Sequence, residues 1–215
     1  GVIPIGNGND FCHAAGVPLD LVEAMRVVTR SDRSINMDVG RLRWGSRAEH
    51  FTNTLGFGFD ATVTLFTKSS RLRGRPMYVA AVLKTIVAEY FAPRYSVRIE
   101  SRGAANAIEV DDAFLMITIG NGKREGGGFI TTPDAVVDDG QLDYLLFGKV
   151  SRPMMFRLIP EVMRGTHGRF PQARLGRFER MVLRADRPFP IHTDGEMLAT
   201  RQDAVHDGIS GNHGA

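Results

Sequence analysis

The hydrophobic period of the chain changes near residue 35, and this change restricts the fold more than any other feature. Residues 21–31 carry apolar side chains at the spacing of a helix, and Asp20 before them is a suitable N-cap. From Ile35 onward, segments such as INMDVGRLRW and EHFTNTLGFGFDA have the short, glycine-interrupted pattern of strands. We therefore predict a domain boundary at residues 32–34.

Most of the remaining chain continues the strand pattern. A helix is predicted from Met77 to Phe91, ended by Pro93, and a second one within residues 151–165. Residues 199–215 have almost no apolar periodicity, and we expect a disordered tail there. The predicted fold is α+β, with antiparallel sheet dominant. Strands are expected within residues 95–102, 107–110, 113–122, 140–150, 177–185 and 188–198.

Composition narrows the classes of function. The chain has 215 residues, of which 43% are hydrophobic, as a globular core requires. The net charge of +3 is too small to indicate a nucleic-acid partner. Cys12 is the only cysteine, which fits a cytoplasmic protein without an internal disulfide. The longest apolar stretch contains Lys84 and Glu89 and is too interrupted to span a bilayer, so membrane contact would be peripheral.

The first candidate site is the turn GNGND, which consists of Gly6, Asn7, Gly8, Asn9 and Asp10. It follows an apolar run that reads as a strand and precedes a helical segment. Such a turn exposes backbone N–H groups at the positive end of a helix, which suits a phosphate. Many strand-to-helix turns are glycine-rich for steric reasons alone, and on this signal alone that explanation is favoured.

Two acidic segments are further candidates. Residues 133–143 have carboxylates at positions 134, 138, 139 and 143, an oxygen-rich set that Mg²⁺ or Ca²⁺ prefers. In HTDGEML, Asp194 or Glu196 could act as a general base or hold a metal-bound phosphate. The ordinary alternative for both segments is an Asp-Gly hairpin turn that faces water.

A basic loop precedes the predicted helix at residue 77. Its cations could contact an anionic membrane surface, with a solvated loop as an equal alternative. The six histidines show no close metal-ligand spacing, so no zinc site is indicated. The cations of the loop are Lys68, Arg71, Arg73 and Arg75.

Taken in order, these segments resemble the diacylglycerol kinase catalytic family, which includes bacterial diacylglycerol kinases and sphingosine kinases. The matching landmarks are GVIPIGNGNDFCHAAGVP, NMDVGRL, NTLGFGFDA, IGNGKREGGGF, TPDAVVDDGQLDYLLF and HTDGEML, and they run from residue 1 to about residue 198. The resemblance implies the end of an α/β nucleotide-binding domain in residues 1–33 and a β-sandwich lipid-substrate domain in residues 34–198.

The resemblance also implies a reaction and a set of site residues. Members transfer the γ-phosphate of ATP to a lipid hydroxyl at a membrane surface. Gly6 to Asp10 match the turn that contacts the nucleotide, although Asn7 stands where most members have Thr. Glu196 matches the proposed base, with Asp194 beside it. Mg²⁺ would be held by the side chain of Asp139 and by the carbonyls of Val136 and Gln141, where Gln141 replaces a usual leucine. The oligomeric state is left open, with a homodimer as one alternative.

Two features depart from the family pattern. The Gly-Gly-Asp-Gly-Thr phosphate-binding loop of the family's first half does not precede Gly1, and the pattern of its closing strand is lost after Leu198. We therefore expect an N-terminally truncated member with very low kinase activity by itself. The alternatives are a non-catalytic fragment that binds lipid or metal and, less favoured, an enzyme like NAD kinase.

Overall fold

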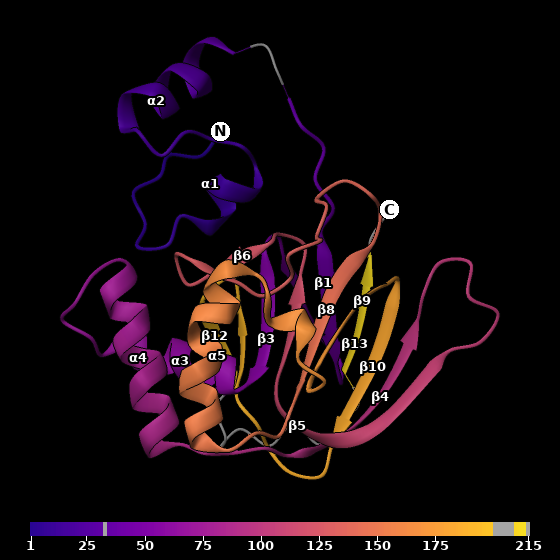
Figure 1. Ribbon diagram of the computed structural model, residues 1–215. Coiled ribbons are helices and arrows are strands. Elements are labelled where there is room, and N and C mark those ends of the chain that lie inside the picture. Colours follow the sequence, from indigo (N-terminus) through magenta and orange to yellow (C-terminus); the bar gives the residue numbers. More distant parts are fainter. Residues whose placement is uncertain (32–33, 200–208, 214–215) are drawn as a thin grey trace.

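A computed structural model of the chain describes residues 1–31 and 34–199 and the backbone of residues 209–213. It consists of a β-sandwich, a layer of helices against one outer face, and a short helical segment near the N-terminus (Figure 1). The predicted α+β class with dominant antiparallel sheet is confirmed.

The sandwich has two sheets that share one long, bent strand, β5 (Ile108–Gly120). The first half of β5 pairs with β4, and its second half pairs with β3 and β8. Every described ladder of the sandwich is antiparallel. The first sheet has the order β12 (Glu196–Ala199), β11 (Ile191–Thr193), β3 (Thr54–Gly58), β5, β8 (Leu142–Gly148) and β9 (Ala173–Phe178). The second has the order β2 (Arg47–Phe51), β1 (Gly40–Trp44), β13 (Ile209–His213), β10 (Arg180–Ala185), β4 (Arg94–Glu100) and β5.

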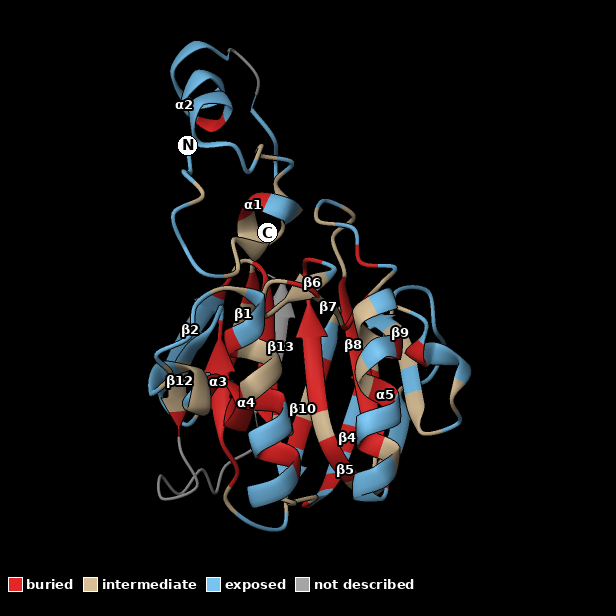
Figure 2. Cartoon of the chain, turned by 60° about the vertical axis from the view of Figure 1, so that its left-hand side comes forward, coloured by how far each residue is buried: buried red, intermediate tan, exposed pale blue. Residues whose placement is uncertain are grey.

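Two apolar layers hold these elements together. Strand β8 contributes to both, because successive side chains of a strand point to opposite faces. Tyr144 and Leu146 join the core between the sheets, whereas Leu145 and Phe147 pack under the helices. Figure 2 shows the first sheet buried behind the helices, which are exposed on their outer sides. A strand covered on both faces reads as a continuous apolar run, as YLLF at residues 144–147 does.

The helical layer consists of α3 (Phe59–Lys68), α4 (Arg75–Ala88) and α5 (Arg152–Arg164). The latter two match the predicted helices. Helix α3 was not predicted, because β-branched residues, typical of strands, make up much of FDATVTLFTK. Its residues 60–64 are buried, so tertiary packing stabilises this helix despite its low propensity. None of the described helices is long and apolar enough to cross a membrane.

The N-terminal segment contains α1 (Asp10–Ala14) and α2 (Leu21–Arg30). Asp20 caps α2 as predicted, since its carboxylate accepts hydrogen bonds from the N–H groups of Val22 and Glu23. The expected strand before Gly6 is not formed. Ile5 is 84% exposed, and none of the described strands pairs with this segment.

The expected disorder of residues 199–215 is wrong at two places. Ala199 ends β12, and the backbone of residues 209–213 forms β13 between β1 and β10. Backbone pairing with two neighbours requires no apolar pattern, so the sequence did not reveal this strand. The other residues of the predicted tail, 200–208 and 214–215, lie outside the described part of the chain.

Candidate active site

A cavity of about 580 Å³ lies between the helices and the first sheet. Its apolar part is lined by buried side chains from α3, α4, α5, β5 and β8. Its polar part is lined by the N-terminal turn and by the β2–β3, β6–β7 and β11–β12 turns. The cavity therefore joins an apolar interior to a set of polar turns. Its apolar lining includes Val63, Val82, Ile86, Leu115, Phe147 and Met155.

The GNGND turn packs backbone to backbone against the short hairpin of β6 (Arg124–Glu125) and β7 (Phe129–Ile130). A Cβ on Gly127 would lie 3.3 Å from Cα of Gly8, and Gly127 has a φ of +68°. The carboxylate of Asp10 accepts hydrogen bonds from the N–H of Gly127 at 3.0 and 3.2 Å. Burial raises the pKa of Asp10, and this hydrogen bond partly opposes the effect. Two glycine-rich loops thus fix each other beside the cavity.

Asp194 and Gly195 form the two-residue hairpin turn between β11 and β12. Both have positive φ, 46° and 82°, and Thr193 pairs with Glu196. Asp194 Oδ1 accepts hydrogen bonds from the N–H groups of Asn53 and Thr54, each at 2.9 Å. Its Oδ2 accepts from the N–H and the hydroxyl of Thr52, at 2.8 and 3.0 Å. Because both of its carboxylate oxygens accept hydrogen bonds from residues 52–54, Asp194 connects the β11–β12 turn to the β2–β3 turn.

Glu196 follows this turn directly and lines the cavity. Its side chain is 79% exposed and forms an ion pair with Lys68 at the end of α3. An exposed carboxylate with one fixed cation beside it is able to accept a proton from a hydroxyl at the cavity. Of the two acids of the Asp-Gly-Glu motif, Glu196 is the one with a free approach.

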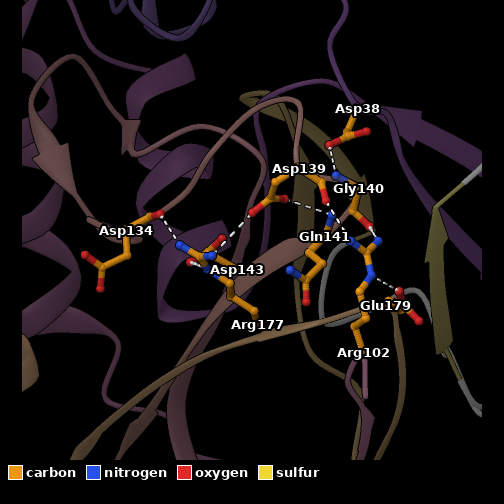
Figure 3. A network of polar contacts seen from close by, with 9 residues as sticks. All are labelled: Asp38, Arg102, Asp134, Asp139, Gly140, Gln141, Asp143, Arg177 and Glu179. Carbon is orange, nitrogen blue, oxygen red and sulfur yellow. Dashed lines mark hydrogen bonds and ion pairs between the residues drawn. The ribbon is translucent and has the colours of Figure 1, made fainter. Parts of the chain in front are cut away.

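The acidic residues of segment 133–143 are not among those that line the cavity. Figure 3 shows Asp134, Asp139 and Asp143 around the guanidinium of Arg177, which lies 3.4 Å from Asp139 Oδ2 and 3.7 Å from Asp143 Oδ1. Burial raises the pKa of Asp143 to about 6, while Arg177 lowers it. Asp139 Oδ1 accepts from the N–H of Gln141 at 2.9 Å. Neither Asp139, Val136 nor Gln141 is among the residues that line the cavity.

The basic loop divides into two parts. Arg71 and Arg73 are exposed between α3 and α4, on either side of the half-exposed Leu72. Lys68 pairs with Glu196, and Arg75 Nε donates a hydrogen bond to the carbonyl of Gly127 at 3.0 Å.

Sequence reasoning missed three polar residues of the cavity wall. Asp60 of α3, Glu125 of β6 and His192 of β11 line the cavity, and their ligand atoms lie within 4.8 Å of one another. All three stand inside quoted motifs, NTLGFGFDA, IGNGKREGGGF and HTDGEML, but their spacing along the chain gives no hint that they meet.

Comparison with known proteins finds relatives that are named lipid kinases. The family described as "YegS C-terminal NAD kinase beta sandwich-like domain" matches residues 53–206. A Stenotrophomonas maltophilia protein named "Probable lipid kinase YegS-like" is 28% identical over 94% of the chain, which covers 63% of that protein. A Mycobacterium tuberculosis protein named "Diacylglycerol kinase" is 28% identical over 78% of the chain and 53% of its own length. The chain thus spans less than two thirds of these relatives.

Solved structures show the same fold. A crystal structure of a diacylglycerol kinase from Bacillus anthracis covers 98% of the chain with a TM-score of 0.63 and 18% identity, and the chain covers 62% of it. The yeast NADH kinase covers 92% with a TM-score of 0.50 and 10% identity, and the chain covers 47% of it. With the match over residues 53–206, the chain belongs to the YegS C-terminal β-sandwich family of diacylglycerol kinase-like lipid kinases.

Proposed function

We propose that this chain forms the lipid-binding side of an ATP-dependent lipid kinase, which transfers the γ-phosphate of ATP to the hydroxyl of a diacylglycerol-like or sphingoid lipid. The apolar cavity of about 580 Å³ carries the proposal, because Glu196 and the GNGND turn line it too. Each CH₂ of an acyl chain buried there contributes about 0.8 kcal/mol. A soluble dinucleotide would gain little from such an interior, so the cavity favours a lipid over NAD.

The proposed reaction assigns a separate task to each group. Glu196 takes the proton of the lipid hydroxyl as its oxygen attacks the γ-phosphorus, and ADP leaves. Lys68 holds Glu196 in place and brings positive charge to the region where the phosphoryl group moves. Asp194 is a positioning residue, since its oxygens already accept four hydrogen bonds. The turn of residues 6–10 contacts the nucleotide.

Mg²⁺ supplies charge compensation for the phosphates when it arrives with ATP. A second Mg²⁺ is proposed at Asp139, whose Oδ2 is buried and without a hydrogen-bond partner among the described residues. The nearest charged group to this oxygen is the guanidinium of Arg177 at 3.4 Å. A carboxylate oxygen in a turn suits a hard cation, and the carbonyls of Val136 and Gln141 would complete its protein ligands. Because these residues do not line the cavity, this cation would hold the turn before β8 and not touch the transferred phosphate.

We further propose that the protein is cytoplasmic and docks on a membrane to reach its lipid. The exposed loop with Arg71, Leu72 and Arg73 supports this, since cations near anionic headgroups contribute about 1 kcal/mol each. The loop connects α3 to α4, and both helices line the cavity. A lipid could therefore leave the bilayer beside the opening.

The test measures transfer of label from [γ-³²P]ATP to vesicles that contain diacylglycerol or sphingosine, with NAD as a soluble competing acceptor. The chain is compared with a version extended upstream to the length of its relatives. We expect label in lipid for the extended protein and at least a 100-fold lower rate for Glu196→Gln. Glu49→Gln, an exposed glutamate on β2, is the matched control and keeps the rate.

Each outcome has a distinct meaning. A Glu196→Gln variant with an unchanged rate would rule out the proposed base. Label in NAD and not in lipid would support the NAD kinase alternative. No label in any acceptor, together with retained binding of a fluorescent diacylglycerol, would leave a non-catalytic lipid-binding module.

A further inference from the structure

Three side chains from separate elements meet in the wall of the cavity. Asp60 is the second residue of α3, Glu125 ends β6, and His192 is the central residue of β11. Asp60 is 8% exposed and His192 is 2% exposed. One ligand atom from each residue lies within 4.8 Å of the others, close enough for a single ion to touch all three.

The fold makes room for this meeting through Gly56 of β3. Gly56 is the register partner of His192 on one side and of Thr118 on the other. A Cβ on Gly56 would lie 2.2 Å from Asp60 Oδ2 and 2.2 Å from His192 Nε2. Any side chain there would therefore displace both groups, and glycine leaves the space they occupy. Thr118 donates a hydrogen bond to Asp60 Oδ2 at 2.9 Å and orients that carboxylate.

The polar atoms of the cluster are not satisfied by the protein alone. Both ring nitrogens of His192 and Oε2 of Glu125 are buried without a hydrogen-bond partner in the described part of the chain. His192 Nε2 lies 3.3 Å from Asp60 Oδ1, which permits an ion pair only when the ring is protonated. Burial, followed by the charge of Asp60, raises the pKa of Glu125. Buried groups of this kind are normally paired, or they coordinate metals.

We propose that Asp60, Glu125 and His192 bind a divalent transition-metal cation of the Mn²⁺ or Zn²⁺ class in the wall of the cavity. One imidazole and two carboxylates suit these ions, whereas Mg²⁺ and Ca²⁺ prefer oxygen ligands alone. Three protein ligands leave coordination positions for water from the cavity. This site is separate from the one proposed at Asp139, and it does not depend on the proposed kinase activity.

Binding of the metal alone tests the site directly. The full chain is freed of metal with EDTA, dialysed, and titrated with MnCl₂ in millimolar Mg²⁺, which fills oxygen-only sites. Electron paramagnetic resonance follows the loss of free Mn²⁺, and ZnCl₂ is then added as competitor. We expect one Mn²⁺ per chain, displaced by Zn²⁺, and at least tenfold weaker binding for Glu125→Gln and for His192→Gln. His50→Gln, an exposed histidine on β2, keeps the affinity.

Glu125→Gln keeps the shape of the side chain and adds no buried charge, so it is the variant that folds most safely. A melting temperature that Mn²⁺ raises in the wild type, and not in this variant, supports the site. Absence of Mn²⁺ uptake in the wild type would overturn the proposal, because the two carboxyl groups then simply share a proton. Unchanged affinity in a folded Glu125→Gln variant would overturn it as well.

Discussion

Replacement of Asp194 by alanine should destabilise the fold by about 4 kcal/mol at pH 7. The N–H groups of Asn53 and Thr54 are partly buried and lose a charged acceptor, which costs about 1.5 kcal/mol each. The two bonds from Thr52 are exposed, and water replaces them at little cost. Alanine at a φ of 46° adds about 1 kcal/mol, because its Cβ crowds the following carbonyl.

Asp194→Asn is the informative comparison. Its amide oxygen still accepts from Asn53 and Thr54, and asparagine tolerates the left-handed conformation. Its NH₂ group faces the N–H of Thr52 where Oδ2 accepted, so we expect a loss of about 1 kcal/mol. The difference of about 3 kcal/mol between the two variants measures the contribution of geometry at this turn.

Urea unfolding followed by the fluorescence of Trp44, the only tryptophan, provides the assay. Trp44 packs against the core between the sheets and should report its loss. Glu49→Ala, exposed on β2, serves as the control and should stay within 0.5 kcal/mol of the wild type, as surface substitutions usually do. An alanine variant of Asp194 as stable as the wild type would refute the positioning role. Equal losses for alanine and asparagine would show that charge, and not geometry, stabilises the turn.

Three further outcomes follow from the structure. Val82→Trp should fill the cavity and weaken binding of a fluorescent diacylglycerol at least tenfold, whereas Ile108→Trp on an exposed position should not, and equal binding by both would contradict the assigned cavity. His167 is buried and its pKa is lowered from 6.5, so the folded state favours the neutral ring. The free energy of unfolding should therefore fall as the pH drops below 6.5, by at most about 1.4 kcal/mol per pH unit. Urea midpoints measured from pH 8 to pH 5 should fall less for His167→Gln than for the wild type. Gly127→Ala should loosen residues 6–10, because residue 127 has a φ of +68° and the alanine Cβ would press on Gly8. Amide hydrogen exchange should rise in residues 6–10 and not in β5. Unchanged exchange in residues 6–10 would exclude the contact.

The sandwich was predictable because its strands carry their own signals. Alternating or continuous apolar runs between glycines placed β4, β8 and the residues of the β11–β12 hairpin. Two strands were expected at residues 107–110 and 113–122, and the structure joins them into the single strand β5. The Asp-Gly of HTDGEML indicated a hairpin turn, and Asp194 and Gly195 form that turn. A strand that pairs through its backbone alone, as β13 does, has no such signal. A helix rich in β-branched residues, as α3 is, has a misleading one, and its burial decides its conformation.

The candidate site was predictable only where its residues are neighbours in the chain. Residues 6–10 and 194–196 form local motifs, and both line the cavity. Asp60, Glu125 and His192 lie on three elements, and the pairing of β3 with β11 and the packing of α3 over Gly56 bring Asp60 and His192 together. No local rule of spacing predicts a cluster of that kind, since it depends on the register of the sheet.

The relative position of the candidate base and the candidate nucleotide turn depends on hydrogen bonds between turns. Asp194 accepts from the N–H of Asn53, and Asn53 Nδ2 donates to the carbonyl of Arg124 at 2.9 Å. The same hairpin then reaches Asp10 through the N–H of Gly127. These bonds link four turns in series from Glu196 to the GNGND segment. Two of these turns, β2–β3 and β11–β12, connect strands of the sandwich. Because each bond joins a side chain to backbone, glycines and short polar residues dominate these turns. A change at Asn53 would thus alter the spacing of the two halves of the site without touching either.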